Sequence, residues 1–383
     1  MILAVDIGTS TLKVAYIDFK GRLHAFHREP YPYNEPVRAE TWEITFFRAL
    51  KHLPSLEPAA ICISGNGPTL VPVNAHNESG SPLFWYGNRT PTRGSSFFLA
   101  HIAYFRDNEP DSYKSTRFFL SAQEWLAWRL GAEPVSVLPA ESYRNFYWDA
   151  EQCDSAGIDP EKLPPFVSMG TIIGKWDGVP IAAGNPDFVA AIIGTGTTEP
   201  GIVCDRAGTS EGINLCIHDP VPVKGLRLMP SPVDGLWNLG GVLPESGSLF
   251  ESYRKNTGQQ NRSYEETLRE IMEDHTENAY QGRAVLEKIA AQVRGVMEQF
   301  QRAGFRIQEM RISGGQAKSP VWNQLKSTLT NCTILVPEVC DGELAGDAVV
   351  AALALGIFPD LDSAVKHMIR IEKLYRPQQG RLL

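Results

Sequence analysis

The sequence predicts an α/β protein built from two related domains, and three observations support this. The chain has 383 residues, a length that favours two domains or one large one. Strand-like and helix-like apolar patterns alternate along most of the chain. The tripeptide Gly-Thr-Ser occurs at 8–10 and again at 208–210, each time between two apolar strand patterns. Because long-range internal similarity indicates a repeat, the simplest interpretation is a duplicated domain with one such turn in each half.

The first half begins with strand patterns and continues with helices. Apolar runs around short turns predict a three-stranded meander over residues 2–32. Helical spacing follows at 40–53, and a buried strand is predicted at 58–66. Further helical patterns occur at 95–106 and 120–130. This alternation is typical of α/β architecture.

The second half repeats the alternation. A strand leads into a short apolar helix over 179–196, and a strand, the second Gly-Thr-Ser turn and another strand occupy 201–219. Residues 263–303 predict one or two long amphipathic helices. The remaining patterns predict a strand, a glycine pair and a helix start at 309–322, a strand at 333–338, and a small-residue helix at 342–356.

The composition is that of an ordinary globular protein and argues against several classes. Hydrophobic residues make up 43% and charged residues 21%, which allows a sizeable core. The net charge of −8 argues against a general nucleic-acid-binding surface. Six scattered cysteines without metal-site spacing predict buried thiols in a reducing compartment. The longest apolar run, 348–358, is too short to cross a bilayer, and the N-terminus lacks a signal core, so we expect a cytoplasmic protein without membrane contact.

The first turn, within "DIGTSTLK" (6–13), carries groups that suit a phosphate. Backbone N–H groups in a tight Gly-Thr-Ser turn converge on an anion, and the hydroxyls of Thr9 and Ser10 add donors. Lys13 supplies a positive charge, and Asp6 suits Mg²⁺ bound through water. From these residues alone, a plain hairpin with a solvated Asp and Lys is an equal alternative.

Other candidate features each have a structural alternative. The turn at 208–210 lacks a matching lysine, so on its own a hairpin is the favoured interpretation. Asp187 opens a helix, where an N-cap competes with a carboxylate that accepts a substrate proton. Gly314 and Gly315 would let a flat ligand approach the backbone, although they form neither a dinucleotide fingerprint nor a P-loop. Arg89 lies among aromatic residues, where stacking at the surface is the alternative.

Six segments in order nevertheless form a specific combination, although each is weak alone. They are "AVDIGTSTLKVAYID" (4–18), "CISGNGPTLVPVNAHNESGSPLFWYGNRT" (62–90), "EWLAWRLGAEPV" (124–135), "GNPDFVAAIIGTGTTEPGIVCDRAGTSEG" (184–212), "RISGGQAKSPVWNQLKSTLTNCTILVPE" (311–338) and "GELAGDAVVAALALG" (342–356). Together they resemble the FGGY carbohydrate kinase family, within the actin/hexokinase/Hsp70-like superfamily. The matching segments are spread over most of the chain.

The resemblance implies two actin-like (ribonuclease H-like) α/β domains, with mixed β-sheets flanked by helices and an active-site cleft between them. It places an N-terminal domain at 1–180, with the sugar-binding side and the first phosphate loop. A C-terminal domain at 181–383 would carry the catalytic Asp, the second phosphate loop and the adenosine motif. The implied activity is transfer of the γ-phosphate of ATP, with Mg²⁺, to a hydroxyl of a small sugar or polyol.

The resemblance also implies roles for individual residues. Asp187 would be the general base and would contact the sugar together with Asn66 and Arg89. Asp6 would bind Mg²⁺ through water. The residues implied for ATP and its phosphates are Thr9, Ser10, Lys13, Gly208, Thr209, Ser210, Gly314, Gly315, Gln316 and Lys318.

The sequence also departs from the family pattern, mainly around the sugar. Asn66 stands where the family usually has Gln, Gly87 where it has Asp, and Phe188 where it has Asn or Gln. The phosphate machinery is therefore expected to be intact and the sugar pocket rebuilt. Two alternatives stay open: a nucleotide- and sugar-binding regulatory module that no longer phosphorylates sugar, and an actin-like ATPase that acts on a protein partner. We expect no nucleic-acid partner, and a homodimer stays open.

Overall fold

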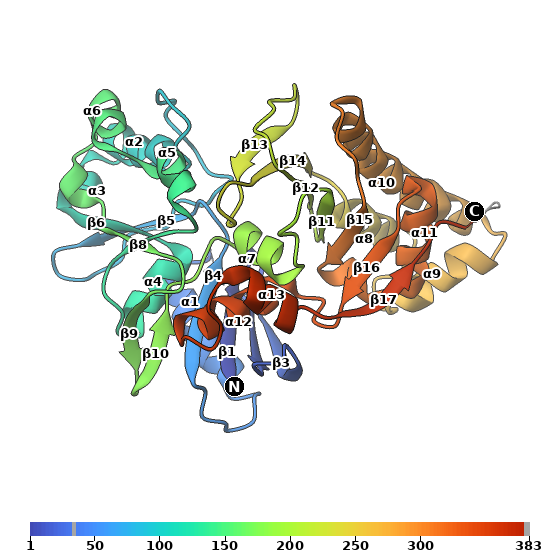
Figure 1. Ribbon diagram of the computed structural model, residues 1–383, viewed down its shortest axis with the longest axis horizontal. Helices are drawn as coiled ribbons and strands as arrows, with labels where there is room; N and C mark the ends of the chain where they lie inside the picture. Colours follow the sequence, from blue (N-terminus) through green and yellow to red (C-terminus); the bar gives the residue numbers. More distant parts are fainter. Residues whose placement is uncertain (33–35, 379–383) are drawn as a thin grey trace. The chain divides into compact units, whose positions relative to one another are not determined.

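A computed structural model describes residues 1–32 and 36–378 (Figure 1). The chain divides into two compact units, described separately below. The first comprises Met1–Gly194 and Glu343–Met368, and the second comprises Thr195–Gly342 and the chain from Ile369 onward. Within the described residues, no helix combines the length and the apolar character that crossing a membrane requires.

The first unit is built on a six-stranded mixed sheet. The meander predicted over 2–32 and the strand predicted at 58–66 are both confirmed. β1 pairs antiparallel with β2 and parallel with β4, which places Asp6 opposite Lys13 on one side and Ser64 on the other. In sheet order the strands are β3 (Leu23–Pro30), β2 (Thr11–Ile17), β1 (Ile2–Ile7), β4 (Ala60–Gly65), β10 (Val179–Ala182) and β9 (Ile172–Trp176).

Helices α1, α7 and α12 support this sheet. α1 (Ala39–Leu50) packs against β2 and β3, and α7 (Asp187–Gly194) contacts β4. α12 (Gly342–Ala354) crosses α7 so closely that a Cβ at Gly346 would lie 1.9 Å from the carbonyl oxygen of Ala190. The small residues predicted at 342–356 therefore allow two buried helices to touch.

The remaining elements of the first unit lie around this centre. The unit also contains two small two-stranded sheets: β5 pairs antiparallel with β6, and β7 pairs parallel with β8. The elements are β5 (Leu70–Asn74), α2 (Leu99–Asn108), α3 (Pro110–Ser115), β6 (Thr116–Ser121), α4 (Ala122–Arg129), β7 (Ser136–Leu138), η1 (Glu141–Tyr143), α5 (Arg144–Tyr147), α6 (Ala150–Ala156), η2 (Pro160–Lys162), β8 (Phe166–Ser168) and α13 (Leu361–Met368).

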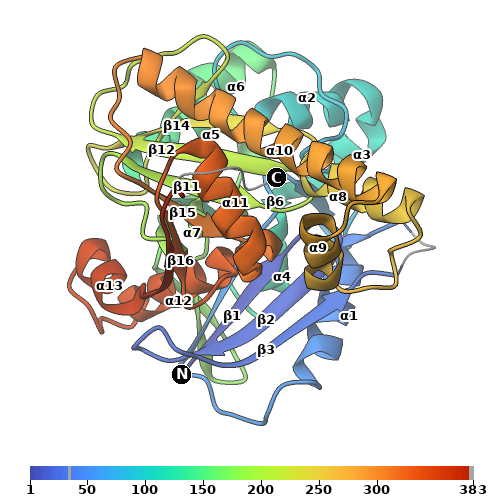
Figure 2. The same cartoon turned by 90° about the vertical axis from the view of Figure 1, so that its right-hand side faces the viewer.

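The second unit is built on a seven-stranded mixed sheet. In sheet order the strands are β13 (Arg227–Pro230), β14 (Trp237–Leu243), β12 (Glu211–Ile217), β11 (Ile202–Ala207), β15 (Glu309–Ser313), β16 (Ile334–Pro337) and β17 (Ile371–Tyr375). The long helix α10 (Glu277–Arg302) runs across β12 and β14 (Figure 2). The other helices are α8 (Gly247–Asn256), α9 (Tyr264–Glu273), η3 (Gly315–Lys318) and α11 (Pro320–Thr330).

The segment 263–303 forms two helices, α9 and α10. Each has its own N-terminal cap: the hydroxyl of Ser263 accepts a hydrogen bond from the Glu266 N–H, and that of Thr276 from the Ala279 N–H. The second cap begins a new helix just after the first one ends, which explains the break.

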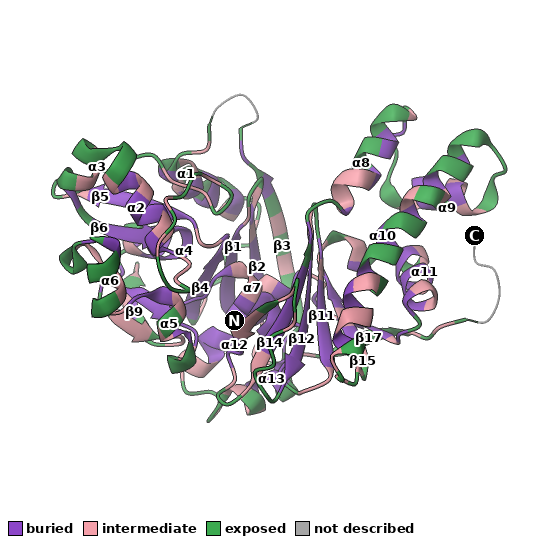
Figure 3. Cartoon of the chain, turned by 90° about the horizontal axis from the view of Figure 1, so that it is seen from above, coloured by how far each residue is buried: buried purple, intermediate pink, exposed green. Residues whose placement is uncertain are grey.

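The two sheets share one topology. The order β3-β2-β1-β4-β10-β9 corresponds to β14-β12-β11-β15-β16-β17, with the same parallel and antiparallel neighbours throughout. β13 is an extra edge strand. β1 and β4 of the first sheet and β12 of the second are buried along their length (Figure 3). The repeat read from two tripeptides thus extends to six strands in each unit.

The compact units differ from the predicted domains 1–180 and 181–383. α7, α12 and α13 pack with the first sheet, although they follow residue 180 in the chain. The physical reason is their apolar surface: residues 189–194 of α7 are buried, and α12 contacts α7 at Gly346. Asp187, which was assigned to the C-terminal domain, therefore belongs to the first compact unit.

Candidate active site

Asp6, Lys13 and Glu343 form a cluster in the first unit that we call the first triad. Asp6 is near the end of β1, Lys13 is its neighbour on β2, and Glu343 is in the first turn of α12. The Nζ of Lys13 lies 3.1 Å from Oδ2 of Asp6 and 3.6 Å from Oε2 of Glu343. About 13% of the Lys13 side chain is exposed, so a ligand can approach this cation.

The first triad carries excess negative charge. Burial raises the pKa of Asp6 to about 7, with Lys13 opposing the shift and the charges of Glu343 and Asp187 adding to it. Two carboxylates therefore contact one ammonium group, and the charge of a third, Asp187, acts on Asp6. Such a site favours an additional cation, since an opposite charge nearby would return Asp6 to its ionised form.

Asp187 is the first residue of α7, as the sequence predicted, and it is partly exposed. The preceding residue, Pro186, forms a β-bridge with Gly65 at the end of β4, which fixes the entry into the helix. The N–H of Phe188 donates to Oδ1 of Asp187 at 2.6 Å. At this position the carboxylate of Asp187 is close enough to Asp6 for their charges to interact.

Residues 8–10, the first loop, present exposed side chains on a fixed backbone. Thr9 and Ser10 are exposed, and the Gly8 N–H donates to the carbonyl of Thr11 at 3.0 Å. Tyr31 holds the loop from the end of β3: its N–H donates to the Ser10 carbonyl and its hydroxyl to the Gly8 carbonyl, both at 3.1 Å. Sequence reasoning missed Tyr31, because no motif marks it.

Residues 208–210, the second loop, have a similar turn with a different support. The Gly208 N–H donates to the carbonyl of Ser210 at 3.1 Å, and Thr209 is exposed. Two N–H groups at the start of α8 hold the loop: Gly247 donates to the Gly208 carbonyl and Ser248 to the Thr209 carbonyl, both at 3.1 Å. Backbone hydrogen bonds thus help to secure this loop.

A buried ionic cluster, the second triad, lies next to the second loop. It consists of Asp205 on β11, Glu211 at the start of β12 and Lys326 on α11, and none of the three side chains is exposed. The Nζ of Lys326 lies 2.7 Å from Asp205 Oδ2 and 2.6 Å from Glu211 Oε1. Sequence reasoning missed this cluster, because its members are far apart in the chain.

The two carboxylates of the second triad have pKa shifts in opposite directions. Burial, and then the charge of Glu211, raise the pKa of Asp205 well above its ordinary value. Burial acts in the same sense on Glu211, but the charge of Lys326 and hydrogen bonds with Asp205, Lys326 and Ser246 together outweigh it, so the pKa of Glu211 falls. Burial would lower the pKa of Lys326, yet the two carboxylates raise it.

The glycine pair and Gln316 are tied to this cluster. Gly314 has a φ of 93°, and a Cβ there would lie 2.6 Å from the carbonyl oxygen of Ala207, so only glycine fits. Gly315 has open space where a side chain would be. Gln316 accepts a hydrogen bond from Lys326 at 3.2 Å and donates to Ser246 at 3.1 Å. Lys326 thus connects Asp205 and Glu211, on either side of the second loop, with Gln316, which follows the glycine pair.

Lys318 and the predicted sugar contacts have partners within the protein. Lys318 is exposed and pairs with Asp341 at 3.0 Å. Asn66 is buried: its Nδ2 donates to the Ile7 carbonyl at 3.1 Å, and its Oδ1 accepts from the Thr69 hydroxyl at 2.5 Å. Arg89 is exposed and donates to the Trp85 carbonyl at 2.8 Å. Contact of these residues with a ligand stays a prediction.

Asp347 is a further carboxylate beneath the first triad. It is buried on α12, and the hydroxyl of Ser64 lies 2.8 Å from its Oδ2 and 3.4 Å from Oδ1 of Asp6. Burial raises the pKa of Asp347 well above its ordinary value, and the charge of Asp6 adds to this. Sequence reasoning missed Asp347, although one signal could have found it: it is an acid within a predicted helix of small apolar residues.

Comparison with known proteins gives consistent matches. The model of the FGGY family of carbohydrate kinases, C-terminal domain, matches residues 260–355. A xylulose kinase of Bacillus subtilis (strain 168) is 21% identical, over 98% of this chain and 93% of that protein. Glycerol kinase 2 of Streptomyces avermitilis is 25% identical, over 65% of this chain and 60% of that protein.

Solved structures agree in fold. A protein from Brucella ovis described as a "xyloylose kinase" has a TM-score of 0.81 at 19% identity, covering 99% of this chain and 95% of that one. Plasmodium falciparum glycerol kinase with ADP has a TM-score of 0.79 at 16% identity, covering 98% of this chain and 94% of that one. These likenesses confirm the predicted α/β fold with two actin-like halves.

Proposed function

We propose that this chain, which belongs to the FGGY family of carbohydrate kinases, transfers the γ-phosphate of ATP to a hydroxyl group of a small sugar or polyol. One observation carries the proposal. The first unit brings Asp187, Asp6 and Lys13 together beside an exposed Gly-Thr-Ser loop. Phosphoryl transfer needs these groups: a proton acceptor, a cation for phosphate oxygens and backbone donors.

In the proposed reaction, a hydroxyl oxygen of the acceptor attacks the γ-phosphorus. The bond from phosphorus to the bridging oxygen breaks, and ADP leaves with that electron pair. Asp187 orients the hydroxyl and takes its proton, while Lys13 and the loop 8–10 stabilise charge on the phosphate oxygens. Because the transition state is loose, positioning and charge supply most of the rate.

Mg²⁺ fits the charge of the first triad. Asp6 and Glu343 share a single lysine there, the charge of Asp187 acts on Asp6, and the pKa of Asp6 is raised to about 7. Asp6 would hold the ion through water, as Mg²⁺ retains much of its hydration shell. When bound, the ion supplies positive charge to the phosphates.

In the second unit, the proposal assigns the nucleotide to the second loop and the glycine pair. Thr209 is exposed, and Gly315 has open space on its Cβ side. Gln316 and Lys318 have partners within the protein, so their contact with ATP would require a change of partner.

ADP release, measured against a panel of pentoses, hexoses, ketoses and polyols, tests the proposal. We expect ATP turnover that depends on one class of acceptor. Asp187→Asn should reduce it by about 10²–10⁴-fold, whereas Asp362→Asn, at an exposed position on α13, should not.

The remaining outcomes would contradict the proposal. Nucleotide binding with no turnover across the panel would favour the regulatory module. Turnover that no acceptor changes would favour an ATPase. Undiminished activity of Asp187→Asn would remove this residue as the base.

A further inference from the structure

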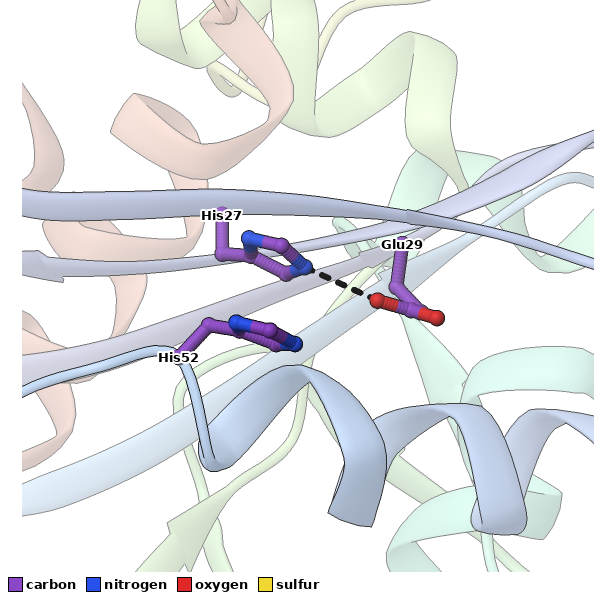
Figure 4. A group of neighbouring side chains, drawn as sticks. All are labelled: His27, Glu29 and His52. Carbon is purple, nitrogen blue, oxygen red and sulfur yellow. Dashed lines mark hydrogen bonds and ion pairs between the residues drawn. The ribbon is translucent and has the colours of Figure 1, made fainter.

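A group of metal-binding side chains lies in the first unit, apart from the proposed active site. His27 and Glu29 are two positions apart on β3, so their side chains leave the same face of the strand, towards α1. His52 follows the C-terminal end of α1. Figure 4 shows the two imidazole rings one above the other, with the carboxylate beside them.

The potential ligand atoms of this group converge. The Nε2 of His27 lies 2.9 Å from Oε2 of Glu29, and the rings of His27 and His52 stack with centroids 4.1 Å apart and planes 14° apart. One atom from each of the three residues lies within 4.8 Å of the other two. Among residues 1–32 and 36–378, this is the one group of three His, Cys, Asp or Glu residues gathered so closely.

We propose that His27, Glu29 and His52 bind a divalent transition-metal ion, with Zn²⁺ as the preferred ion. Two imidazole nitrogens and a carboxylate oxygen form a common Zn²⁺ ligand set, and a water completes a tetrahedron. Imidazole favours Zn²⁺ over Mg²⁺ or Ca²⁺, which prefer oxygen ligands.

Metal binding requires the stacked rings of His27 and His52 to tilt relative to one another. The ion replaces the hydrogen bond between His27 and Glu29, and the proton on the coordinating nitrogen moves to Nδ1, the other ring nitrogen. Tetrahedral Zn²⁺ with bonds of about 2.0–2.1 Å brings neighbouring nitrogens to about 3.4 Å. His52 is exposed and lies in a turn beyond α1, so its ring can tilt towards the ion.

Arg48 favours one orientation of the carboxylate. Its Nη2 lies 2.6 Å from Oε1 of Glu29, while Oε2 faces His27. One oxygen is therefore anchored and the other points at the ligand position, the arrangement in which a partner outside the ligand set orients a ligand. The competing interpretation is an ion pair between Glu29 and Arg48, with no metal.

The proposed ion would connect β3 with the end of α1. The two elements already pack together, so the ion would act as a structural clamp. None of its three ligands belongs to the proposed catalytic machinery. The inference therefore does not depend on kinase activity.

Isothermal titration of the chelator-treated chain with ZnCl₂ tests the site. We expect one saturable site per chain, which His27→Ala and His52→Ala each weaken by at least about tenfold, as losing even an outer-shell partner costs about 10–100-fold. His24→Ala is the matched control, since His24 lies on the same strand and pairs with Asp18 at 2.9 Å. It should bind Zn²⁺ like the unaltered chain.

Two further measurements test the site even if an alanine variant folds poorly. Glu29→Gln keeps the shape of the side chain and should also weaken binding. Co²⁺ bound to the unaltered chain should show the strong visible absorption of a tetrahedral site. Absence of saturable Zn²⁺ binding, or equal affinity in His27→Ala, His52→Ala and the unaltered chain, would overturn the proposal.

Discussion

The two triads contain the same kinds of group in different surroundings. In the first, Lys13 lies between Asp6 and Glu343 at 3.1 and 3.6 Å, and part of the lysine is exposed. In the second, Lys326 lies between Asp205 and Glu211 at 2.7 and 2.6 Å, with no exposure. Shorter distances and complete burial distinguish the second triad.

The difference in exposure and distance indicates that the two triads have different roles, although each consists of a lysine between two carboxylates. A buried ammonium group with both carboxylates in contact has satisfied its charge within the protein, and losing it would leave a buried unpaired charge. A partly exposed lysine with longer contacts can still attract an incoming anion. We therefore infer that the second triad stabilises its loop and that the first takes part in chemistry.

We expect the largest effect from a substitution that breaks the second triad. Lys326→Met should lower the free energy of unfolding by about 3–5 kcal/mol, because Asp205 and Glu211 would lose their shared cation inside the protein. Urea denaturation followed by circular dichroism measures this. Lys13→Met is the matched control and should change the same quantity by much less. Equal losses in the two variants would contradict the division of roles.

The next effect concerns the first triad and activity. Lys13→Met should reduce kcat/KM for ATP by about 10²–10³-fold, since it removes a cation proposed to stabilise the phosphate. Steady-state kinetics with the best acceptor measures this.

Lys20→Met, at an exposed position beyond β2, controls for loss of positive charge from the unit. If its kinetics changed as much as those of Lys13→Met, a general field effect would explain the loss.

A pH effect of intermediate size follows from Asp6. Its pKa is raised to about 7 in the folded chain, so between pH 4 and 7 the folded state holds a proton that the unfolded state releases. Stability should therefore fall as pH rises through this window. Between pH 5.5 and 7 this amounts to about 1.5 kcal/mol, which Asp6→Asn should abolish.

Denaturant titrations at both pH values, with a chelator present, measure this difference. The stability of the unaltered chain relative to Asp6→Asn should decline from pH 5.5 to 7. A constant difference, or one of opposite sign, would show that the pKa of Asp6 is not raised.

The sequence predicted the fold well because its signals are local. Strand patterns, Gly-Thr-Ser turns and the helix after Asp187 were found at the predicted positions. The unit boundaries were harder, since α12 joins the first unit through a contact between Gly346 and Ala190 that no local pattern encodes.

The site shows the same limit. Thr9, Lys13 and Asp187 were predicted because they lie in or near recognisable turns. The second triad joins residues 205, 211 and 326, and Asp347 reaches Ser64 across the chain, so only the folded structure reveals these contacts. The family resemblance implies that Asn66 contacts the sugar, and this stays a prediction; in the structure its amide is bonded to Ile7 and Thr69.

The smallest expected effect concerns the hydrogen bonds that hold the two loops, which differ between them. Tyr31→Phe removes the hydroxyl that donates to the Gly8 carbonyl, at a cost of about 0.5–1.5 kcal/mol. The carbonyls of the second loop accept hydrogen bonds from backbone N–H groups, whereas a carbonyl of the first loop accepts one from this side chain. Tyr31→Phe should therefore raise the KM for ATP a few-fold.

Tyr16→Phe is the matched control for Tyr31→Phe, since Tyr16 also donates from a strand of the first sheet to a carbonyl, that of Leu56, at 3.0 Å. Both variants should lose similar stability in denaturant titrations, but Tyr16→Phe should leave the KM for ATP unchanged because its partner lies away from the loop. If both variants shifted the KM equally, the effect would come from general loosening of the sheet. If neither did, the backbone bond from the Tyr31 N–H to Ser10 would be enough to hold the first loop, and its support would resemble that of the second.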